Sequence, residues 1–218
     1  TVSSSVNTIA VGTSHSLVIK KDKTLWAAGD NSLGQLGVSS VSDSDGVKVM
    51  SNVVYAEAND DSSFAIDANG TLYGWGDNAN GQVAPTSSSE VITKPTKIMD
   101  NVAQVAAGDT HTIALTTDGT VYGWGSNDYG ELGFAVNYST NNAVKIMDNV
   151  SDIAEGDGFS LFVTKNGELY ACGDNSSGQL GEGDYNSRTT PVKVINDGVS
   201  MAEAGTAHSV VSFLRTTE

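Results

Sequence analysis

Val121-Tyr-Gly-Trp-Gly-Ser-Asn-Asp-Tyr-Gly-Glu-Leu-Gly133 is the stretch that decides the fold, because the chain contains four versions of it. The other three versions are Leu25 to Gly37, Leu72 to Ala84 and Leu169 to Gly181. One glycine precedes the bend of each version, in steps of 47, 49 and 48 residues, at Gly29, Gly76, Gly125 and Gly173. This period indicates one supersecondary unit repeated in tandem, as in propeller blades or solenoid coils.

Composition narrows the class of protein. The 218 residues carry a formal net charge of -15 at pH 7, so we expect the surface to repel phosphate and exclude nucleic acid as a partner. The lone cysteine, Cys172, allows no intrachain disulfide. No apolar run approaches the roughly 18 residues that a membrane-spanning helix needs, so no membrane span is expected.

Each repeat divides into four short segments with strand character. In the third repeat they are Val102 to Gly108, Thr112 to Thr116, the quoted stretch, and Val144 to Met147. Small residues in the first segment suit an innermost strand, and unbroken apolar residues in the second suit a strand covered on both faces. Lys145 among apolar neighbours marks the fourth as a half-exposed outer strand.

Turn signals separate the second segment from the third. Asn69-Gly70, Asp118-Gly119 and Asn166-Gly167 are dipeptides that favour a type I′ hairpin turn. Asp22-Lys23 stands at the same place in the first repeat and predicts a looser hairpin there.

The segments add up to an all-β protein built from four-stranded antiparallel blades, with about four and a half repeats in a single β-propeller domain or propeller fragment spanning residues 1–218. We place the repeats at about 6–52, 53–101, 102–149, 150–198 and, in part, 199–214. The fifth repeat stops after two strands. An open strand edge there would invite pairing with another chain, so self-association through that edge is an expectation.

A motif before the second strand extends the pattern. Gly12-Thr-Ser-His15-Ser, Gly108-Asp-Thr-His111-Thr and Gly205-Thr-Ala-His208-Ser each run into an apolar strand, a glycine turn and the Tyr-Gly-Trp-Gly type of stretch. From about Val6 to Leu214 the chain resembles the repeats of the regulator of chromosome condensation family. The resemblance implies a β-propeller, normally of seven blades of about 50 residues. The chain departs from it in repeat count and in Ser62 and Phe159, which replace the histidine.

This departure leaves three arrangements open: a piece of a larger propeller, a ring closed with fewer blades, or assembly with another chain. We favour the first.

The histidines, and the aspartates beside glycines, recur at fixed repeat positions, which favours structural roles over chemical ones. His15, His111 and His208 share one repeat position, which favours bonding within each blade over metal binding. Asp109 and Asp157 also recur beside glycines, and we interpret them as turn residues rather than a catalytic pair. We therefore expect no catalytic residues, no metal and no cofactor, and Cys172 is expected to be a buried, inert thiol.

Function is expected in the residues that do not recur, since the scaffold explains those that do. Aromatic residues and arginine in the variable connections are the residue types of interface hot spots, and they predict a partner-binding set: Tyr129, Phe134, Tyr138, Tyr185 and Arg188.

The sequence thus predicts a non-catalytic protein-interaction module, with an unidentified protein as the partner. The Asn-, Ser-, Thr- and Asp-rich composition favours a secreted or cell-surface bacterial protein. The alternative is a carbohydrate-acting or carbohydrate-binding propeller. The resemblance also implies nucleotide exchange on a small GTPase, chromatin docking, or, in secreted bacterial members, inhibition of β-lactamases. Nucleotide exchange is disfavoured because the sequence shows no long insertion that could act as an exchange wedge. Chromatin docking is disfavoured because the negative net charge does not suit a nucleosome.

Overall fold

The computed structural model describes residues 5–39, 43–135 and 139–214. No helix occurs among them, and none therefore has the length and apolar character to cross a membrane. The strands are β1 Val6–Val11, β2 His15–Lys20, β3 Leu25–Asp30, β4 Asp43–Met50, β5 Val53–Asn59, β6 Ser62–Asp67, β7 Leu72–Asp77, β8 Val91–Met99, β9 Val102–Ala107, β10 His111–Thr116, β11 Val121–Gly125, β12 Thr140–Met147, β13 Val150–Gly156, β14 Phe159–Thr164, β15 Leu169–Gly173, β16 Arg188–Ile195, β17 Val199–Gly205 and β18 His208–Phe213.

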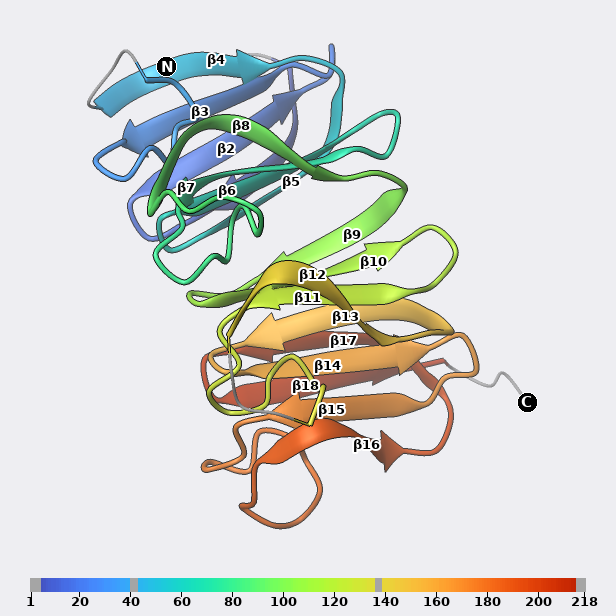
Figure 1. Ribbon diagram of the computed structural model, residues 1–218. Helices are drawn as coiled ribbons and strands as arrows, with labels where there is room; N and C mark the ends of the chain where they lie inside the picture. The colour runs from blue at the N-terminus through green and yellow to red at the C-terminus, as the bar shows by residue number, and fades with distance from the viewer. Residues whose placement is uncertain (1–4, 40–42, 136–138, 215–218) are drawn as a thin grey trace.

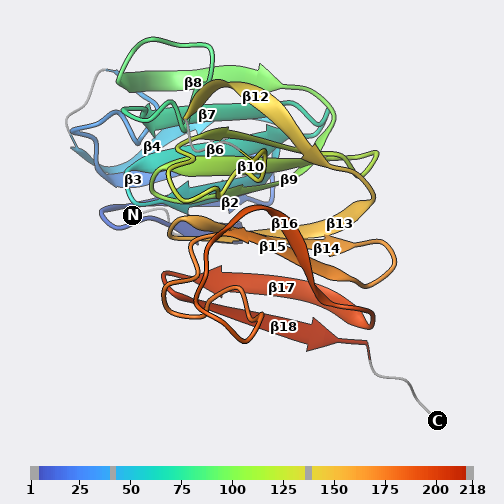
Figure 2. The same ribbon diagram turned by 60° about the horizontal axis from the view of Figure 1, so that its bottom comes forward.

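The strands form four antiparallel sheets of four consecutive strands each, followed by the two-stranded sheet β17–β18. Each sheet is one blade, and the blades follow one another side by side in chain order (Figure 1). A second view shows the same succession with β17 and β18 at its end (Figure 2). The all-β propeller architecture of about four and a half blades that the repeats predict is confirmed.

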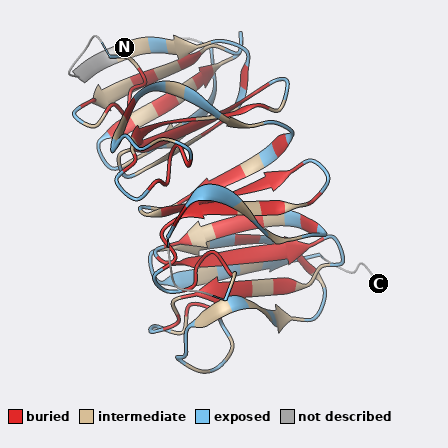
Figure 3. Ribbon diagram, viewed as in Figure 1, coloured by how far each residue is buried: buried red, intermediate tan, exposed pale blue. Residues whose placement is uncertain are grey.

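The buried core lies between blades. Every residue of β6, β10 and β14 is buried, as expected for second strands whose two faces are both covered by neighbouring blades. Trp75 and Trp124 are fully buried, while exposed residues gather on the fourth strands (Figure 3). A Cβ placed on Gly37 would lie 2.9 Å from Nε1 of Trp75, so the large ring of one blade packs on a glycine of the preceding blade.

The first strands lie innermost and bond to one another around the axis. The Gln104 amide on β9 donates to Asp152 Oδ1 and to the Ile153 carbonyl on β13, both at 3.1 Å. Asp152 Oδ2 in turn accepts the Ala202 amide of β17 at 2.9 Å. These bonds fix the inner ends of successive blades against one another.

Two local predictions are wrong. Of the Asn69–Gly70 pair only Gly70 has a positive φ, +81°. The Gly70 amide donates to the Asp67 carbonyl, and the Asp67 amide donates to the Thr71 carbonyl. This is a three-residue loop ending in a bulge, not a type I′ turn. Lys23 takes the same position with φ +62° and makes the equivalent bonds, so the first hairpin is no looser than the others.

The fourth strands also begin earlier than predicted. β12 begins at Thr140 rather than Val144, because the ladder with β11 resumes beyond a register shift and pairs Gly125 with Thr140. The bulge hid this pairing from the period-2 pattern of the sequence.

Candidate binding site at the loop end

Two kinds of connection emerge at one end of the molecule. Antiparallel pairing puts the turn between the first and second strands of a blade beside the connection between its third and fourth strands; in the second blade, Ser62 at the turn pairs with Gly76 before the connection. We call this end, on the left in Figure 1, the loop end. The hairpins between second and third strands lie at the opposite end.

The loop-end connections are held by repeated hydrogen bonds. The side-chain oxygen of an asparagine just after the third strand accepts the amide of a leucine five residues on, as Asn127 does from Leu132 at 2.8 Å. The backbone carbonyl of Gln82 then accepts two donors of the next blade, Thr112 Oγ1 at 2.8 Å and Trp124 Nε1 at 2.7 Å. Because these bonds recur from blade to blade, the loop end is a fixed platform.

Cationic side chains are unevenly distributed along the blades, whereas carboxylates lie at both ends. Carboxylates crowd the loop end, among them Asp60, Asp109, Asp128 and Asp157, all exposed. The lysines of the described residues lie on strand β2, on outer strands or in hairpins of the opposite end. Within the described ranges the loop-end cation is Arg188, which pairs with Glu182 and Asp184. The loop end is therefore an acidic surface without a free cation among its described residues.

A cavity of about 250 Å³ opens at the centre of this end, where four first-to-second-strand turns converge. Its walls come from β5, β9, β13, β17 and the residues that follow them, including Asn59, Asp109, Asp157 and Thr206. Glu155 of β13 also lines it, and the Glu155 side chain is only 1% exposed. Among the described residues, neither carboxyl oxygen of Glu155 has a hydrogen-bond partner of acceptable geometry.

Glu155 lies at one end of a chain of buried polar groups. Its Oε1 is 3.3 Å from Nδ1 of His111, and Nε2 of His111 is 3.0 Å from Oγ of Ser160. The Ser160 hydroxyl donates to the Glu131 carbonyl at 2.9 Å, so it must accept from His111, whose Nε2 therefore carries a proton. This chain of polar groups crosses three times between the third and fourth blades and ties the cavity to their interface.

Burial shifts the pKa values of both ionisable groups of this chain in the direction that favours their neutral forms. Burial raises the pKa of Glu155 well above its usual range, and the neighbouring carboxylates Glu57 and Asp109 raise it further. Burial also lowers the pKa of His111 to about 3. The 3.3 Å contact is accordingly a weak interaction between a carboxylic acid and a neutral imidazole, rather than an ion pair.

Glu155→Gln should remove a pH-dependent loss of stability. The folded chain keeps the Glu155 proton above pH 4.5, where the unfolded chain releases it, so rising pH favours unfolding of the wild type until the raised folded pKa is passed. Glutamine does not titrate. The melting temperature of the variant relative to wild type should therefore increase from pH 5 to pH 8. His111 has the opposite slope below pH 6.5, but it is present in both chains.

The matched control is Glu90→Gln, which changes an exposed glutamate of the same end. Its melting temperature should follow the wild-type pH curve. A Glu155→Gln difference that stayed constant between pH 5 and pH 8 would contradict a neutral Glu155.

The expectation that each histidine bonds within its own blade is wrong. His15 bonds Ser63 at 2.8 Å, and His111 bonds Ser160, in each case on the following blade. The imidazole ring of His15 lies over Gly12, the glycine of the turn before it, since a Cβ on Gly12 would be 2.5 Å from Cε1 of His15. In the second repeat Ser62 stands at the histidine position, so no ring covers the turn. The turn glycine of that repeat is replaced by Asn59.

The predicted partner-binding residues are dispersed over the loop end. Tyr129 is 54% exposed and lies over Gly158, beside Asp157 at the cavity. Phe134 is half-buried against the core cluster that contains Leu132. Among the described members of the set, Tyr129 contacts Gly158, the residue that follows the cavity residue Asp157.

The other three differ in their surroundings. Tyr185 is 74% exposed above Gly178 of its own blade. Arg188 is held inside its connection by Glu182, Asp184 and the Asn186 carbonyl. Tyr138 lies outside the described residues. Partner binding by the five residues stays a prediction.

Sequence reasoning did not single out Glu155. The available signal was its repeat position, where the other units have Val11, Ala58, Ala107 and Ala204. A glutamate among small apolar residues at an inner strand indicates a special role, but its contact with His111 could not be predicted without the blade interface.

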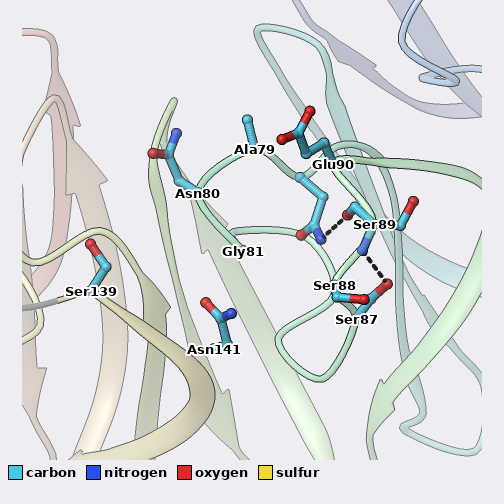
Figure 4. A pocket seen from close by; sticks show the side chains of 10 residues that line it. Ala79, Asn80, Gly81, Ser87, Ser88, Ser89, Glu90, Ser139 and Asn141 are labelled. Carbon is cyan, nitrogen blue, oxygen red and sulfur yellow. Dashed lines mark hydrogen bonds between the residues drawn. The ribbon is translucent and has the colours of Figure 1, made fainter.

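A second hollow, of about 320 Å³, lies between the loop-end connections of the second and third blades (Figure 4). Its lining is hydroxyl- and amide-rich, with Asn80, Ser139 and Asn141 around its mouth and Glu90 as its charged residue. Ser87, Ser89 and Asn78 bond within the β7–β8 connection. We call this hollow the amide cleft. No group of three or more metal-ligating side chains occurs among the described residues.

Comparison with known proteins places this geometry among propellers. A family model described as the RCC1-like domain matches residues 1–211. The crystal structure of human WBSCR16 is similar with a TM-score of 0.84 and 26% identity, over 96% of this chain and 58% of that one.

Two yeast structures show the same likeness. Prp20p from Saccharomyces cerevisiae, described with its binding properties to Gsp1p and histones, has a TM-score of 0.84 at 22% identity, over 98% of this chain and 57% of that one. Yeast RCC1 (Prp20) bound to Kap60 has a TM-score of 0.85 at 23% identity, over 97% of this chain and 55% of that one. This chain thus spans little more than half the length of these proteins.

Proposed function

Because the chain belongs to the RCC1-like domain family, we propose that it is a non-catalytic protein-interaction module whose acidic loop end binds a basic segment of a protein partner. The observation that supports this most is the uneven distribution of cationic side chains. Asp60, Asp109, Asp128 and Asp157 are exposed at the end whose described cation, Arg188, is already paired. A surface of one sign attracts partners of the other sign and speeds their encounter.

The central cavity supplies a specific position within this surface. A lysine or arginine side chain entering it would lie near Asp109 and Asp157, with Glu155 beneath. A nearby cation favours the charged form of a carboxyl, so binding would draw the proton from Glu155. Tyr129 is exposed beside Gly158 and supplies an aromatic surface one residue away from the cavity lining. Binding is therefore expected to release a proton and to strengthen as pH rises.

The test uses fluorescein-labelled hexalysine, with hexaglutamine as the neutral peptide, and measures anisotropy at two salt concentrations. Hexalysine should bind more tightly, and its affinity should fall with salt because exposed charges are screened. The Asp109→Asn/Asp157→Asn double variant should weaken binding about fivefold, as expected for a loss of about 1 kcal/mol. Calorimetry in buffers of different ionisation enthalpy should detect the released proton.

The matched control is Asp197→Asn, a single exposed charge at the opposite end. It should change the affinity by less than about twofold, because single exposed charges contribute little. Equal weakening by the loop-end and opposite-end variants, per charge removed, would show attraction by net charge alone and would refute a site at the cavity.

The amide cleft favours a second candidate, carbohydrate binding. Its asparagine and serine side chains are donors and acceptors of the kind that sugar hydroxyls bond. Binding on a glycan array that was lost with Asn80→Ala/Asn141→Ala, but unchanged in the Asp109→Asn/Asp157→Asn variant, would support this candidate over the acidic site.

We also propose a secreted or cell-surface location, which the Asn-, Ser-, Thr- and Asp-rich composition favours. Fractionation of the source cells, with detection of the chain in the medium or at the surface, tests it. Nucleotide exchange and chromatin docking are not part of the proposal.

A further inference from the structure

The amide cleft lies between two blades that each have described neighbours on both sides. One wall is the β7–β8 connection of the second blade, and the other is the beginning of β12 in the third blade (Figure 4). The first blade packs against the second, and the fourth blade packs against the third (Figure 1). The cleft is therefore formed by contacts in the middle of the row of blades.

The cleft opens because the second and third blades approach each other less closely here than the neighbouring pairs do. In each pair, a glycine after the third strand faces the beginning of the fourth strand of the next blade. A Cβ on Gly130 would lie 2.5 Å from the Thr189 Cα, and the equivalent distance between the first and second blades is 3.0 Å. For Gly81 the distance to the Asn141 Cα is 3.9 Å. The wider separation leaves room for a ligand.

Hydrogen bonds fix both walls of the cleft. On the β7–β8 side, the Asn78 side chain donates to the Ser89 carbonyl at 2.7 Å, and the Ser89 hydroxyl donates to the Val91 carbonyl at 2.8 Å. On the β12 side, Oγ1 of Thr140 accepts the Asn142 amide at 3.1 Å, which fixes the turn that carries the residue between them. The walls are thus formed before any ligand arrives, which lowers the cost of binding.

A second set of side chains in the cleft keeps its hydrogen-bonding groups available. Asn80 and Asn141 carry amides, Ser88 a hydroxyl and Glu90 a carboxylate, and all four residues are exposed. In the part of the chain that the structure describes, these four side chains form no hydrogen bond or ion pair. Amides and hydroxyls both donate and accept, whereas an ionised carboxylate only accepts. The cleft therefore offers mixed neutral groups and one acceptor with a full charge.

This lining selects among polar ligands. A volume of about 320 Å³ is at the small end of ligand pockets and suits roughly one or two sugar rings. The apolar side chain of the described lining is Ala79, so hydrogen bonds rather than aromatic stacking would hold a sugar. Glu90 repels phosphorylated and carboxylated sugars and attracts an ammonium group, with which it can form a charge-assisted hydrogen bond.

We propose that the amide cleft binds a hexosamine with a free amino group, whose ammonium contacts Glu90 and whose hydroxyls bond the amides of Asn80 and Asn141. This inference rests on the carbohydrate-binding candidate for the cleft and specifies the class of sugar. It is independent of peptide binding at the central cavity, whose lining shares no residue with the cleft.

The test titrates the ¹⁵N-labelled full chain with three disaccharides of the same linkage, built from glucosamine, N-acetylglucosamine or glucose. They differ in one substituent of each ring: an ammonium, an acetamide or a hydroxyl. Binding is followed on the side-chain amide signals of Asn80 and Asn141, which Asn80→Ala and Asn141→Ala assign. At about pH 6, where amines of this kind carry a proton, the glucosamine disaccharide should bind about threefold more tightly than the glucose disaccharide.

Glu90→Gln tests the charged contact. It should lower the affinity for the glucosamine disaccharide to that for the glucose disaccharide and leave the latter unchanged. Glu90 is exposed, so the variant should keep the wild-type fold, which the remaining amide signals check. The matched control is Asp197→Asn, which removes one exposed charge at the opposite end and should keep the threefold preference.

Each outcome bears on the proposal. Preference for the glucosamine disaccharide that is lost in Glu90→Gln alone supports it. Equal binding of the glucosamine and glucose disaccharides would overturn the hexosamine class but leave the carbohydrate candidate standing. Unchanged signals of Asn80 and Asn141 with all three sugars would overturn both. Equal shifts of these signals with hexalysine would also overturn it, because the cleft would then belong to the peptide-binding surface.

Discussion

Gly125→Ala is expected to lower the free energy of unfolding by on the order of 4 kcal/mol, the range in which backbone strain and a steric clash act together. Gly125 has φ +99°, a conformation that L side chains rarely adopt. An added Cβ would lie 2.5 Å from the Thr110 carbonyl oxygen and 2.9 Å from the His111 Cα. Both are backbone atoms of the adjacent strand and turn, so neither can move aside. Urea unfolding measures the loss.

Gly183→Ala separates the two causes. Gly183 has φ +84°, but no heavy atom of the described part of the chain lies within 4 Å of the position of an added Cβ. Alanine there should cost only the backbone strain, about 1 to 2 kcal/mol. Equal losses for the two variants would mean that the close approach of blade strands at Gly125 contributes nothing.

The same glycines explain why the fold could be predicted from the sequence. Gly29, Gly76, Gly125 and Gly173 all have positive φ at the end of the third strand, just before the bend. A position that only glycine fills easily repeats with the structural unit, so the spacing of glycines gives the spacing of blades. The turn type could not be inferred, because an Asn-Gly pair fits both a two-residue turn and a three-residue loop with a bulge.

The site was less predictable because its contacts join different blades. His111 and Ser160 are 49 residues apart, and Glu155 reaches His111 from the next blade. The repeat position shared by the three histidines indicated that each one bonds to a structural neighbour. It did not indicate the blade on which that neighbour lies. The predicted partner-binding residues were easier to identify, because they lie in connections that do not repeat. Their surroundings could not be inferred in this way: Arg188 is bonded within its own connection.

One exchange within the repeat shows how paired substitutions preserve the scaffold. The Gln82 side chain donates to Asp77 at 3.0 Å and accepts the Asn80 amide at 2.9 Å. In the third blade the corresponding residues are Ser126 and Glu131, and Glu131 still accepts the Tyr129 amide, at 2.8 Å. Burial raises the pKa of Glu131. The exchange adds a further carboxyl, besides Glu57 and Asp109, that raises the pKa of Glu155.

Trp124→Ala is expected to lower the free energy of unfolding by about 4 kcal/mol, the range found for large core aromatics. The side chain is fully buried and donates to the Gln82 carbonyl of the preceding blade at 2.7 Å. Trp26→Ala is the matched control. Trp26 is half-buried, its N–H bonds Thr24 of its own blade, and Lys20 lies 4.0 Å from the ring centroid. That variant should lose about 1 kcal/mol. Urea unfolding of both variants decides whether tryptophans stabilise the protein between blades or within them. Similar losses would contradict the interface role. A much larger loss for Trp124→Ala means that the repeated stretch couples neighbouring blades.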